Sequence, residues 1–301
     1  MKIGIFLKIT EDLAMGVAAP KYTEIREQAL AVEECGFDSI WLQDHLLSRI
    51  DEEGTEGVWE CWTLLSALAE ATNRVEIGPL VICNPFRNPA LLAKMAHTLD
   101  EVSEGRLILG VGAGWHQPEF DAFGYSFERR VDRFEEALQI LTPLLKGKSV
   151  DFEGVYYQVR DCVITPRGPR AQGVPLMVGT NGPRMLRLAA RYADLRHTAS
   201  SIGLHDLPEQ FTRMRHACAE VDRDPATLPF VVGIRVDFPD LGAGKARENE
   251  SVLTGSPEQI ATAFRSYDDA GVAHLTLYGR TDSLPAIQRL AESLRLYRES
   301  D

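Results

Sequence analysis

The feature that most constrains the fold is an alternation, repeated about eight times, between short apolar runs and amphipathic segments. The runs, such as Ile3–Ile9 and Phe230–Val236, are too short for helices and suit strands that are buried on both faces. The segments between them, such as residues 89–102, place apolar side chains at helical spacing. Strands separated by helices pair in parallel, so the 301 residues are predicted to form a single (β/α)8 TIM barrel domain over residues 1–301.

One segment departs from this rhythm. Residues 150–159 alternate around Glu153-Gly154, which predicts a β-hairpin insertion in the barrel. An open, doubly wound sheet is the main alternative architecture. It is disfavoured because no glycine-rich dinucleotide fingerprint follows the first strand and no linker divides the chain.

Charge and cysteine content exclude several kinds of partner. The net charge of -12 disfavours binding to nucleic acid or to an anionic membrane. No apolar run approaches the roughly 20 residues that span a bilayer, and the N-terminus resembles a strand rather than a signal peptide. Five scattered cysteines without CxxC spacing favour a reducing compartment. We therefore expect a cytoplasmic protein with a small-molecule substrate.

The stretch Gly105–His116 stands out because it ends a predicted buried strand in three closely spaced small residues, Gly112-Ala113-Gly114. A backbone without bulky side chains allows a flat ligand to approach closely. We expect Gly112, Gly114 and Trp115 to contact a cofactor. Trp115 and His116, which follow the glycines directly, are expected to face the substrate.

Polar residues follow several predicted strands, and in a barrel the C-terminal strand ends form the active-site mouth. His45, after Asp44, is the candidate catalytic residue because an imidazole exchanges protons near neutral pH. The alternative is that His45 only caps the strand through hydrogen bonds. Lys8 is a candidate substrate contact, and Cys83 is a candidate cofactor contact by its position.

A candidate anion site follows the strand predicted at residues 175–179. Pro183 at the first position of a helix leaves backbone N–H groups free at the helix N-terminus, where a phosphate is favoured. The alternative is an ordinary turn. The residues assigned to this cofactor-binding segment are Gly179, Thr180, Asn181, Gly182, Pro183 and Arg184.

A metal site is not expected. His45, His116 and His197 could meet in the fold, but neither HxH nor HExxH spacing supports metal binding. The cysteines have no visible activating partner and are interpreted as packing residues.

The segment 105–115, together with Glu119 and Phe123-Gly124, resembles the bacterial luciferase-like family, and so do residues 182–194 and 255–260. The resemblance implies a (β/α)8 barrel with a flavin-type ring across its mouth. It also implies reduced FMN with oxygen, or hydride transfer by the deazaflavin coenzyme F420, and a homodimer. Asp44-His45 resembles the F420-dependent branch, where the histidine lies beside the ring.

The family also has a bulged third strand with a non-prolyl cis peptide behind the ring, which by position resembles Leu80-Val81. The resemblance places the cofactor phosphate at residues 179–184. Two features depart from the family pattern. Trp115 replaces the acidic residue of the sugar-phosphate dehydrogenase branch, which disfavours a sugar-phosphate substrate, and Asp194-Leu195-Arg196-His197 replaces the usual Asp-Gly-Trp segment.

The leading prediction is therefore an oxidoreductase that transfers a hydride between F420 and a small organic substrate held over the deazaflavin ring. The alternatives are a reduced-FMN-dependent monooxygenase and, from another class, a non-catalytic flavin-binding protein. A metal-dependent barrel hydrolase is disfavoured by the glycine-rich end of the fourth strand.

Overall fold

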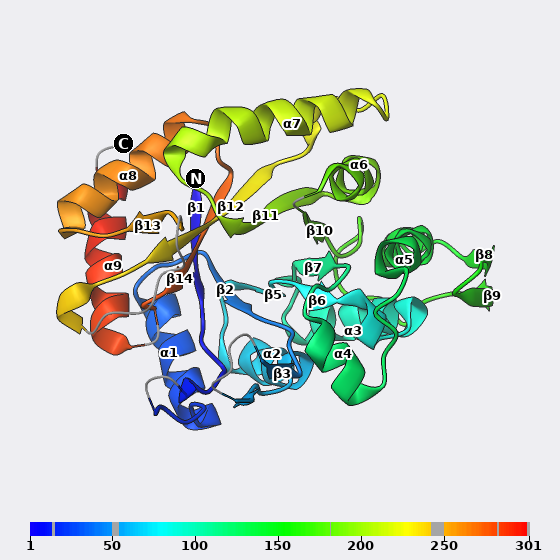
Figure 1. The fold of residues 1–301 in the computed structure, drawn as a ribbon, viewed down its shortest axis with the longest axis horizontal. Coiled ribbons are helices and arrows are strands. Elements are labelled where there is room, and N and C mark those ends of the chain that lie inside the picture. The colour runs from blue at the N-terminus through cyan, green and yellow to red at the C-terminus, as the bar shows by residue number, and fades with distance from the viewer. Residues whose placement is uncertain (14–15, 50–53, 181, 242–249, 282, 300–301) are drawn as a thin grey trace.

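The structure of the protein is a computed structural model, which describes residues 1–13, 16–49, 54–180, 182–241, 250–281 and 283–299. Its principal sheet is parallel, and the helices lie around the outside (Figure 1). In chain order the strands of this sheet are β1 (Lys2–Phe6), β2 (Ser39–Leu42), β5 (Glu76–Pro79), β6 (Ile82–Cys83), β7 (Leu109–Gly112), β10 (Leu176–Gly179), β11 (Leu195–Ser201), β12 (Phe230–Val236), β13 (Val252–Leu253) and β14 (His274–Gly279).

The sheet closes because β5 and β6 are two halves of one stretch of chain. The strand order runs β5-β2-β1-β14-β12-β11-β10-β7-β6, so these halves stand at its two ends. A parallel bridge between Ile77 and Leu107 joins β5 to the segment that leads into β7. The predicted (β/α)8 barrel is confirmed. The predicted cis peptide is confirmed too, since Leu80-Val81 is cis and lies between the two halves.

The helices begin and end close to the positions that the sequence predicts. Asn88 accepts hydrogen bonds from the N–H groups of Ala90 and Leu91, with Pro89 at the first helical position, and Ser256 caps a later helix in the same way. The helices are α1 (Tyr22–Glu34), α2 (Cys61–Ala71), α3 (Pro89–Val102), α4 (Gln117–Phe123), α5 (Arg130–Leu145), α6 (Pro183–Tyr192), α7 (Leu207–Ala219), α8 (Pro257–Asp269) and α9 (Leu284–Arg298).

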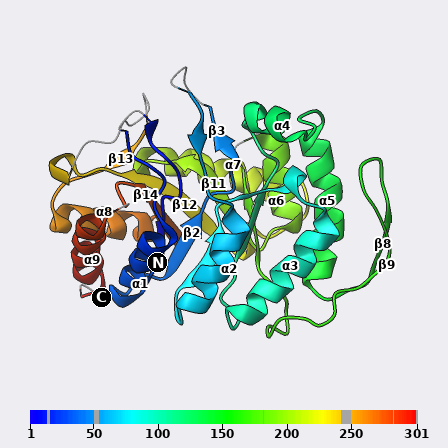
Figure 2. The ribbon, with the colours of Figure 1, turned by 90° about the horizontal axis from the view of Figure 1, so that it is seen from below.

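The predicted hairpin insertion is confirmed as the antiparallel pair β8 (Val150–Glu153) and β9 (Gln158–Cys162). It projects away from the barrel beyond α5 (Figure 1). Four short elements were not predicted, namely α4, β13, β3 (Leu47–Ser48) and β4 (Glu56–Gly57), because they are too short to show a periodic pattern. In Figure 2, β3 and α4 lie at the end of the molecule opposite the C-terminus.

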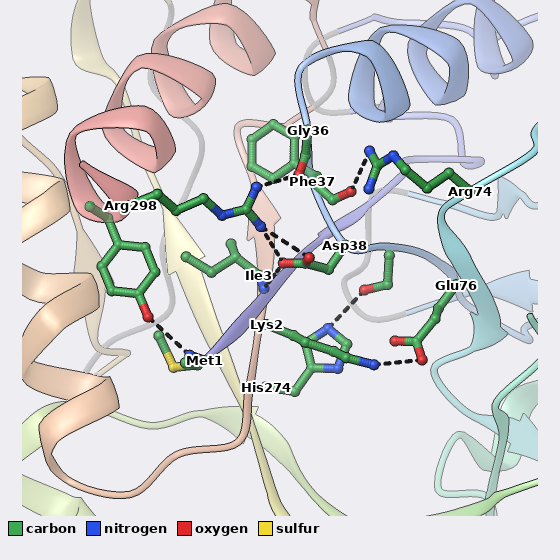
Figure 3. Close-up of polar contacts among 12 residues, drawn as sticks. Met1, Lys2, Ile3, Gly36, Phe37, Asp38, Arg74, Glu76, His274 and Arg298 are labelled. Carbon is green, nitrogen blue, oxygen red and sulfur yellow. Dashed lines mark hydrogen bonds and ion pairs between the residues drawn. The ribbon is translucent and has the colours of Figure 1, made fainter. Parts of the chain in front are cut away.

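A polar cluster ties the first and last elements together at the N-terminal ends of the strands (Figure 3). Arg298 of α9 donates to both carboxylate oxygens of Asp38, at 2.9 and 3.0 Å, and to the carbonyl of Gly36 at 2.8 Å. Asp38 in turn accepts the backbone N–H of Ile3 at 2.8 Å. These bonds fix the last helix against β1 and β2, and they leave the opposite end of the barrel for the site.

The barrel interior holds a small apolar cluster of Trp41, Ile108, Met177 and Val231. The larger hydrophobic core lies between the strands and the surrounding helices. Trp41 Nε1 donates to Ser39 Oγ at 2.7 Å, so its buried polar atom is paired as a buried indole requires. The barrel interior is therefore filled with side chains beneath the C-terminal ends of the strands.

Candidate active site

A cavity of about 560 Å³ opens at the C-terminal ends of the barrel strands. Its volume lies within the range of small-molecule sites, roughly 300–1,000 Å³. The lining side chains come from loops and strands that are far apart in the sequence. They are Phe6, Gln43, Asp44, His45, Leu80, Val81, Ile82, Cys83, Gly114, Trp115, Glu119, His197, Arg235, Glu250, Thr276 and Tyr278.

His45 and Glu119 form a hydrogen-bonded pair in this cavity. His45 Nδ1 lies 3.0 Å from Glu119 Oε1, and Glu119 Oε2 also accepts the N–H of Leu46 at 2.9 Å. Glu119 is buried, whereas the His45 side chain is 23% exposed. Because a carboxylate only accepts, Nδ1 donates its proton and Nε2 remains available for proton exchange. Trp115 stands edge-on to His45, with 5.6 Å between ring centroids.

Asp44 is held by a buried ion pair. Arg87 donates to both of its oxygens, at 2.7 and 3.0 Å, and the N–H of Cys83 donates at 2.9 Å. Arg87 also bonds Glu60, the residue that caps α2, at 2.6 Å. Burial raises the pKa of Asp44, and the Arg87 guanidinium opposes that rise. This network joins the chain after β2, the end of β6 and the start of α2 next to the cavity.

The glycines at positions 110, 112 and 114 lie where a side chain would meet neighbouring parts of the chain. A Cβ at Gly110 would overlap the carbonyl of Pro79, and one at Gly112 would lie 2.8 Å from Val81 Cγ2. A Cβ at Gly114 would meet Cys83 Sγ at 2.7 Å. Gly110 and Gly112 therefore accommodate the neighbouring cis segment, whereas Gly114 makes room for Cys83 and Phe120 and also lines the cavity. Gly112 is not among the residues that line the cavity, and its contact with a cofactor stays a prediction.

Gly110→Ala is expected to lower the free energy of unfolding by about 1–3 kcal/mol, because overpacking forces β5 and β7 apart. Gly182→Ala is the matched control, since nothing lies within 4 Å of the added methyl group. Its effect should stay below about 0.5 kcal/mol. Urea unfolding measures both values, and equal losses in the two variants would contradict this explanation.

Arg196 and His197, which differ from the family pattern, lie in two different environments. His197 lines the cavity, and its Nε2 lies 3.1 Å from Thr276 Oγ1. Burial lowers the pKa of His197 to about 3, so the ring is neutral at physiological pH. Arg196 is buried elsewhere, with its guanidinium 4.5 Å from the centre of the Phe230 ring and donating to Gln210 at 2.9 Å. Of the two residues, only His197 lines the cavity.

Two predicted substrate contacts lie outside the cavity lining. Lys8 forms an ion pair with Asp12 at 3.2 Å. His116 is buried behind Trp115, where its Nε2 accepts the N–H of Arg49 at 3.0 Å. The assignment of these two residues to substrate binding stays a prediction, and the structure gives each a structural partner.

The predicted phosphate segment also lies outside the lining. Pro183 occupies the first position of α6 and Gly182 precedes it, as predicted. Arg184 pairs with Asp132 and Glu135 of α5, so an anion here would compete with two carboxylates. Gly179 and Thr180 are buried at the end of β10. Asn181 lies outside the described residues, and cofactor binding by this segment stays a prediction.

The structure adds cavity residues to which sequence reasoning had assigned no role. Glu119 stood within the family-like segment, and only the fold shows its contact with His45. Arg235 could have been noticed as a charged residue inside an otherwise apolar strand, Phe230–Val236. The other unassigned lining residues are Phe6, Gln43, Ile82, Glu250 and Thr276.

Within the described ranges, no group of three His, Cys, Asp or Glu side chains is arranged to hold a metal ion. No described helix has the length and apolar character required to cross a membrane.

A parallel barrel whose cavity at the strand ends combines apolar side chains with a histidine–glutamate pair is typical of enzymes that act on small molecules. The sequence profile of the family described as luciferase-like monooxygenase matches residues 1–238. The chain therefore belongs to the luciferase-like monooxygenase family.

Individual relatives extend this comparison. The chain is 36% identical to an F420-dependent glucose-6-phosphate dehydrogenase of Amycolatopsis mediterranei, over 85% of this chain and 88% of that protein. It is 33% identical to a 5,10-methylenetetrahydromethanopterin reductase of Archaeoglobus fulgidus, over 58% of this chain but only 48% of the reductase. An F420-dependent secondary alcohol dehydrogenase structure superposes with a TM-score of 0.81 at 21% identity, covering 99% of both chains.

Proposed function

We propose that the protein is an F420-dependent oxidoreductase that acts on a small organic substrate. The observation that carries the proposal is the His45–Glu119 pair in a cavity at the strand ends of a luciferase-like barrel. The relatives compared above are named F420-dependent glucose-6-phosphate dehydrogenase and methylenetetrahydromethanopterin reductase, and both names describe redox enzymes.

The cavity residues fit a deazaflavin ring. Such a ring needs an apolar surface along its face, and Leu80, Val81 and Ile82 provide a continuous one beside Phe6. Cys83 and Gly114 complete the lining on the same side. Bound F420 supplies hydride transfer, which no protein side chain can perform by itself.

The protein's own contribution is orientation and proton transfer. Glu119 holds the Nδ1–H of His45, which fixes the imidazole and leaves Nε2 to accept or donate the proton that accompanies substrate oxidation or reduction. Trp115 packs edge-on against His45 within the cavity lining. The ion pair of Asp44 with Arg87 keeps the strand end that carries His45 in place.

A side-by-side titration tests the cofactor. We expect the purified protein to quench the fluorescence of F420 and to bind FMN more weakly. Turnover should not depend on oxygen, since a deazaflavin at C5 does not form the oxygen adduct that a flavin monooxygenase uses. Binding of FMN without F420, or strict dependence on oxygen, would instead establish the reduced-FMN monooxygenase.

We infer further that the chain forms one domain and acts as a cytoplasmic homodimer. The family resemblance supports the homodimer, and the five cysteines, all of which are free thiols, support a reducing compartment. Light scattering coupled to gel filtration tests the oligomeric state, and a monomer would contradict it.

A further inference from the structure

Three polar side chains on one wall of the cavity have no role in the proton transfer described above. Arg235 of β12, Tyr278 of β14 and Glu250, which precedes β13, all line the cavity. Tyr278 Oη donates to Glu250 Oε1 at 2.8 Å, and Glu250 Oε2 lies 3.9 Å from Arg235 Nη1. We call these three residues the Arg235 cluster.

The Arg235 guanidinium is short of hydrogen-bond acceptors. Its side chain is only 16% exposed, and its nearest anionic partner, Glu250, stands beyond hydrogen-bond distance. Within the described part of the chain, its buried Nε also has no partner. A guanidinium carries five N–H donors, and buried donors in native proteins are almost always paired. A ligand oxygen in the cavity would supply an acceptor for the terminal N–H groups of this guanidinium.

The charges on the lining decide what kind of oxygen fits. Arg235 is the only lysine or arginine among the described lining residues, whereas Asp44, Glu119 and Glu250 contribute three carboxylates. Arg87 neutralises Asp44, and Glu250 lies beside Arg235 and offsets its charge. A phosphate or carboxylate ligand would meet the remaining negative charge of Glu119 and, among the described lining residues, no cation that is not already offset. An uncharged ligand would not be repelled.

Resting on the function proposed above, we propose that the Arg235 cluster recognises an uncharged substrate that bears two neighbouring oxygen groups. The oxygen on the reacting carbon faces His45. The neighbouring oxygen is a hydroxyl that accepts a hydrogen bond from Arg235 and donates one to the carboxylate of Glu250, whose other oxygen is already held by Tyr278. Vicinal diols and hydroxyketones have this pattern. Phosphorylated sugars carry an added negative charge, and the cation of this wall, Arg235, is already offset by Glu250.

The test compares three small alcohols that share one reacting carbon: isopropanol, propylene glycol and lactate. They differ only in the neighbouring group, which is a methyl, a neutral hydroxymethyl or a carboxylate. With F420-loaded wild-type protein, we expect kcat/KM for propylene glycol to exceed that for isopropanol about tenfold, the value of one hydrogen bond to a charged group. Lactate should be the poorest substrate. Ligand-observed NMR gives the matching order of affinities.

Arg235→Gln should abolish the preference for propylene glycol while F420 fluorescence quenching stays at the wild-type level. Glu250→Gln, which keeps the shape of the side chain, should reduce the same preference and provides a second test if Arg235→Gln does not fold. Arg295→Gln is the matched control, because Arg295 is exposed on α9 and pairs only with Glu299 among the described residues.

Three results would overturn the proposal. A preference for lactate would make the wall an anion site. Equal rates with isopropanol and propylene glycol in the wild type would show that no second oxygen is recognised. Loss of F420 quenching in Arg235→Gln would assign the cluster to the cofactor. Failure of the wild type to quench F420 would instead refute the proposed function itself, so the two failures are separable.

Discussion

His45→Ala is expected to reduce kcat for F420-dependent turnover by about 10²–10⁴-fold, the usual contribution of a positioned acid or base. The side chain lines the cavity, and its Nδ1 is held 3.0 Å from the buried Glu119 carboxylate. Alanine removes the Nε2 that exchanges the proton but leaves the apolar surface for the ring. The affinity for F420, measured by fluorescence quenching, should therefore be largely retained.

Two further variants separate proton transfer from structural support. Glu119→Gln should lower kcat less than His45→Ala, because the imidazole stays in the cavity and loses only the carboxylate that orients it. His205→Ala is the control, since this imidazole is 79% exposed and lies outside the cavity lining. Wild-type turnover in His45→Ala, with normal F420 binding, would show that His45 serves only as a structural cap.

Arg87→Ala is expected to destabilise the fold by about 3–5 kcal/mol, the cost of breaking a buried ion pair from one side. Arg87 makes two hydrogen bonds to Asp44, whose side chain is 1% exposed, and removing it leaves that carboxylate buried without a cation. Arg295→Ala on the exposed face of α9 should leave the free energy of unfolding essentially unchanged. Chemical denaturation measures both.

The loss of stability in Arg87→Ala should depend on pH. Without Arg87, burial holds the pKa of Asp44 above its value in the unfolded chain, so the folded state binds the proton more tightly. The deficit in stability relative to the wild type should therefore be smaller at about pH 5 than at about pH 8. A deficit that grows as the pH falls would contradict the assignment of the loss to an unpaired carboxylate.

Much of the fold followed from local patterns. Asn88-Pro89 and Ser256-Pro257 predicted helix starts, because capping depends on a few adjacent residues. The hairpin around Glu153-Gly154 was equally local. The short elements α4, β13 and the β3–β4 pair carry too few residues to display a period, so pattern analysis missed them.

The site was predictable only in part. Strand-end logic placed Asp44, His45, Cys83 and Trp115 in one cavity, because the C-terminal ends of parallel strands meet at one face of a barrel. For His116 the same logic stays a prediction, since Trp115 lines the cavity while His116 is buried and bonds to Arg49. Which of two adjacent side chains turns inward depends on the path of the loop, and spacing along the chain does not encode that path.

The sequence by itself determined the barrel, its hairpin insertion and its family, because alternating apolar runs, caps and contiguous motifs are local properties of the chain. Only the tertiary structure decided the partners: Glu119 on His45, Arg87 on Asp44, and Val81 in the space left by Gly112. Each of these contacts joins residues that lie far apart in sequence. Their distances are set by how the closed sheet brings the strand ends together, and no single segment contains that information.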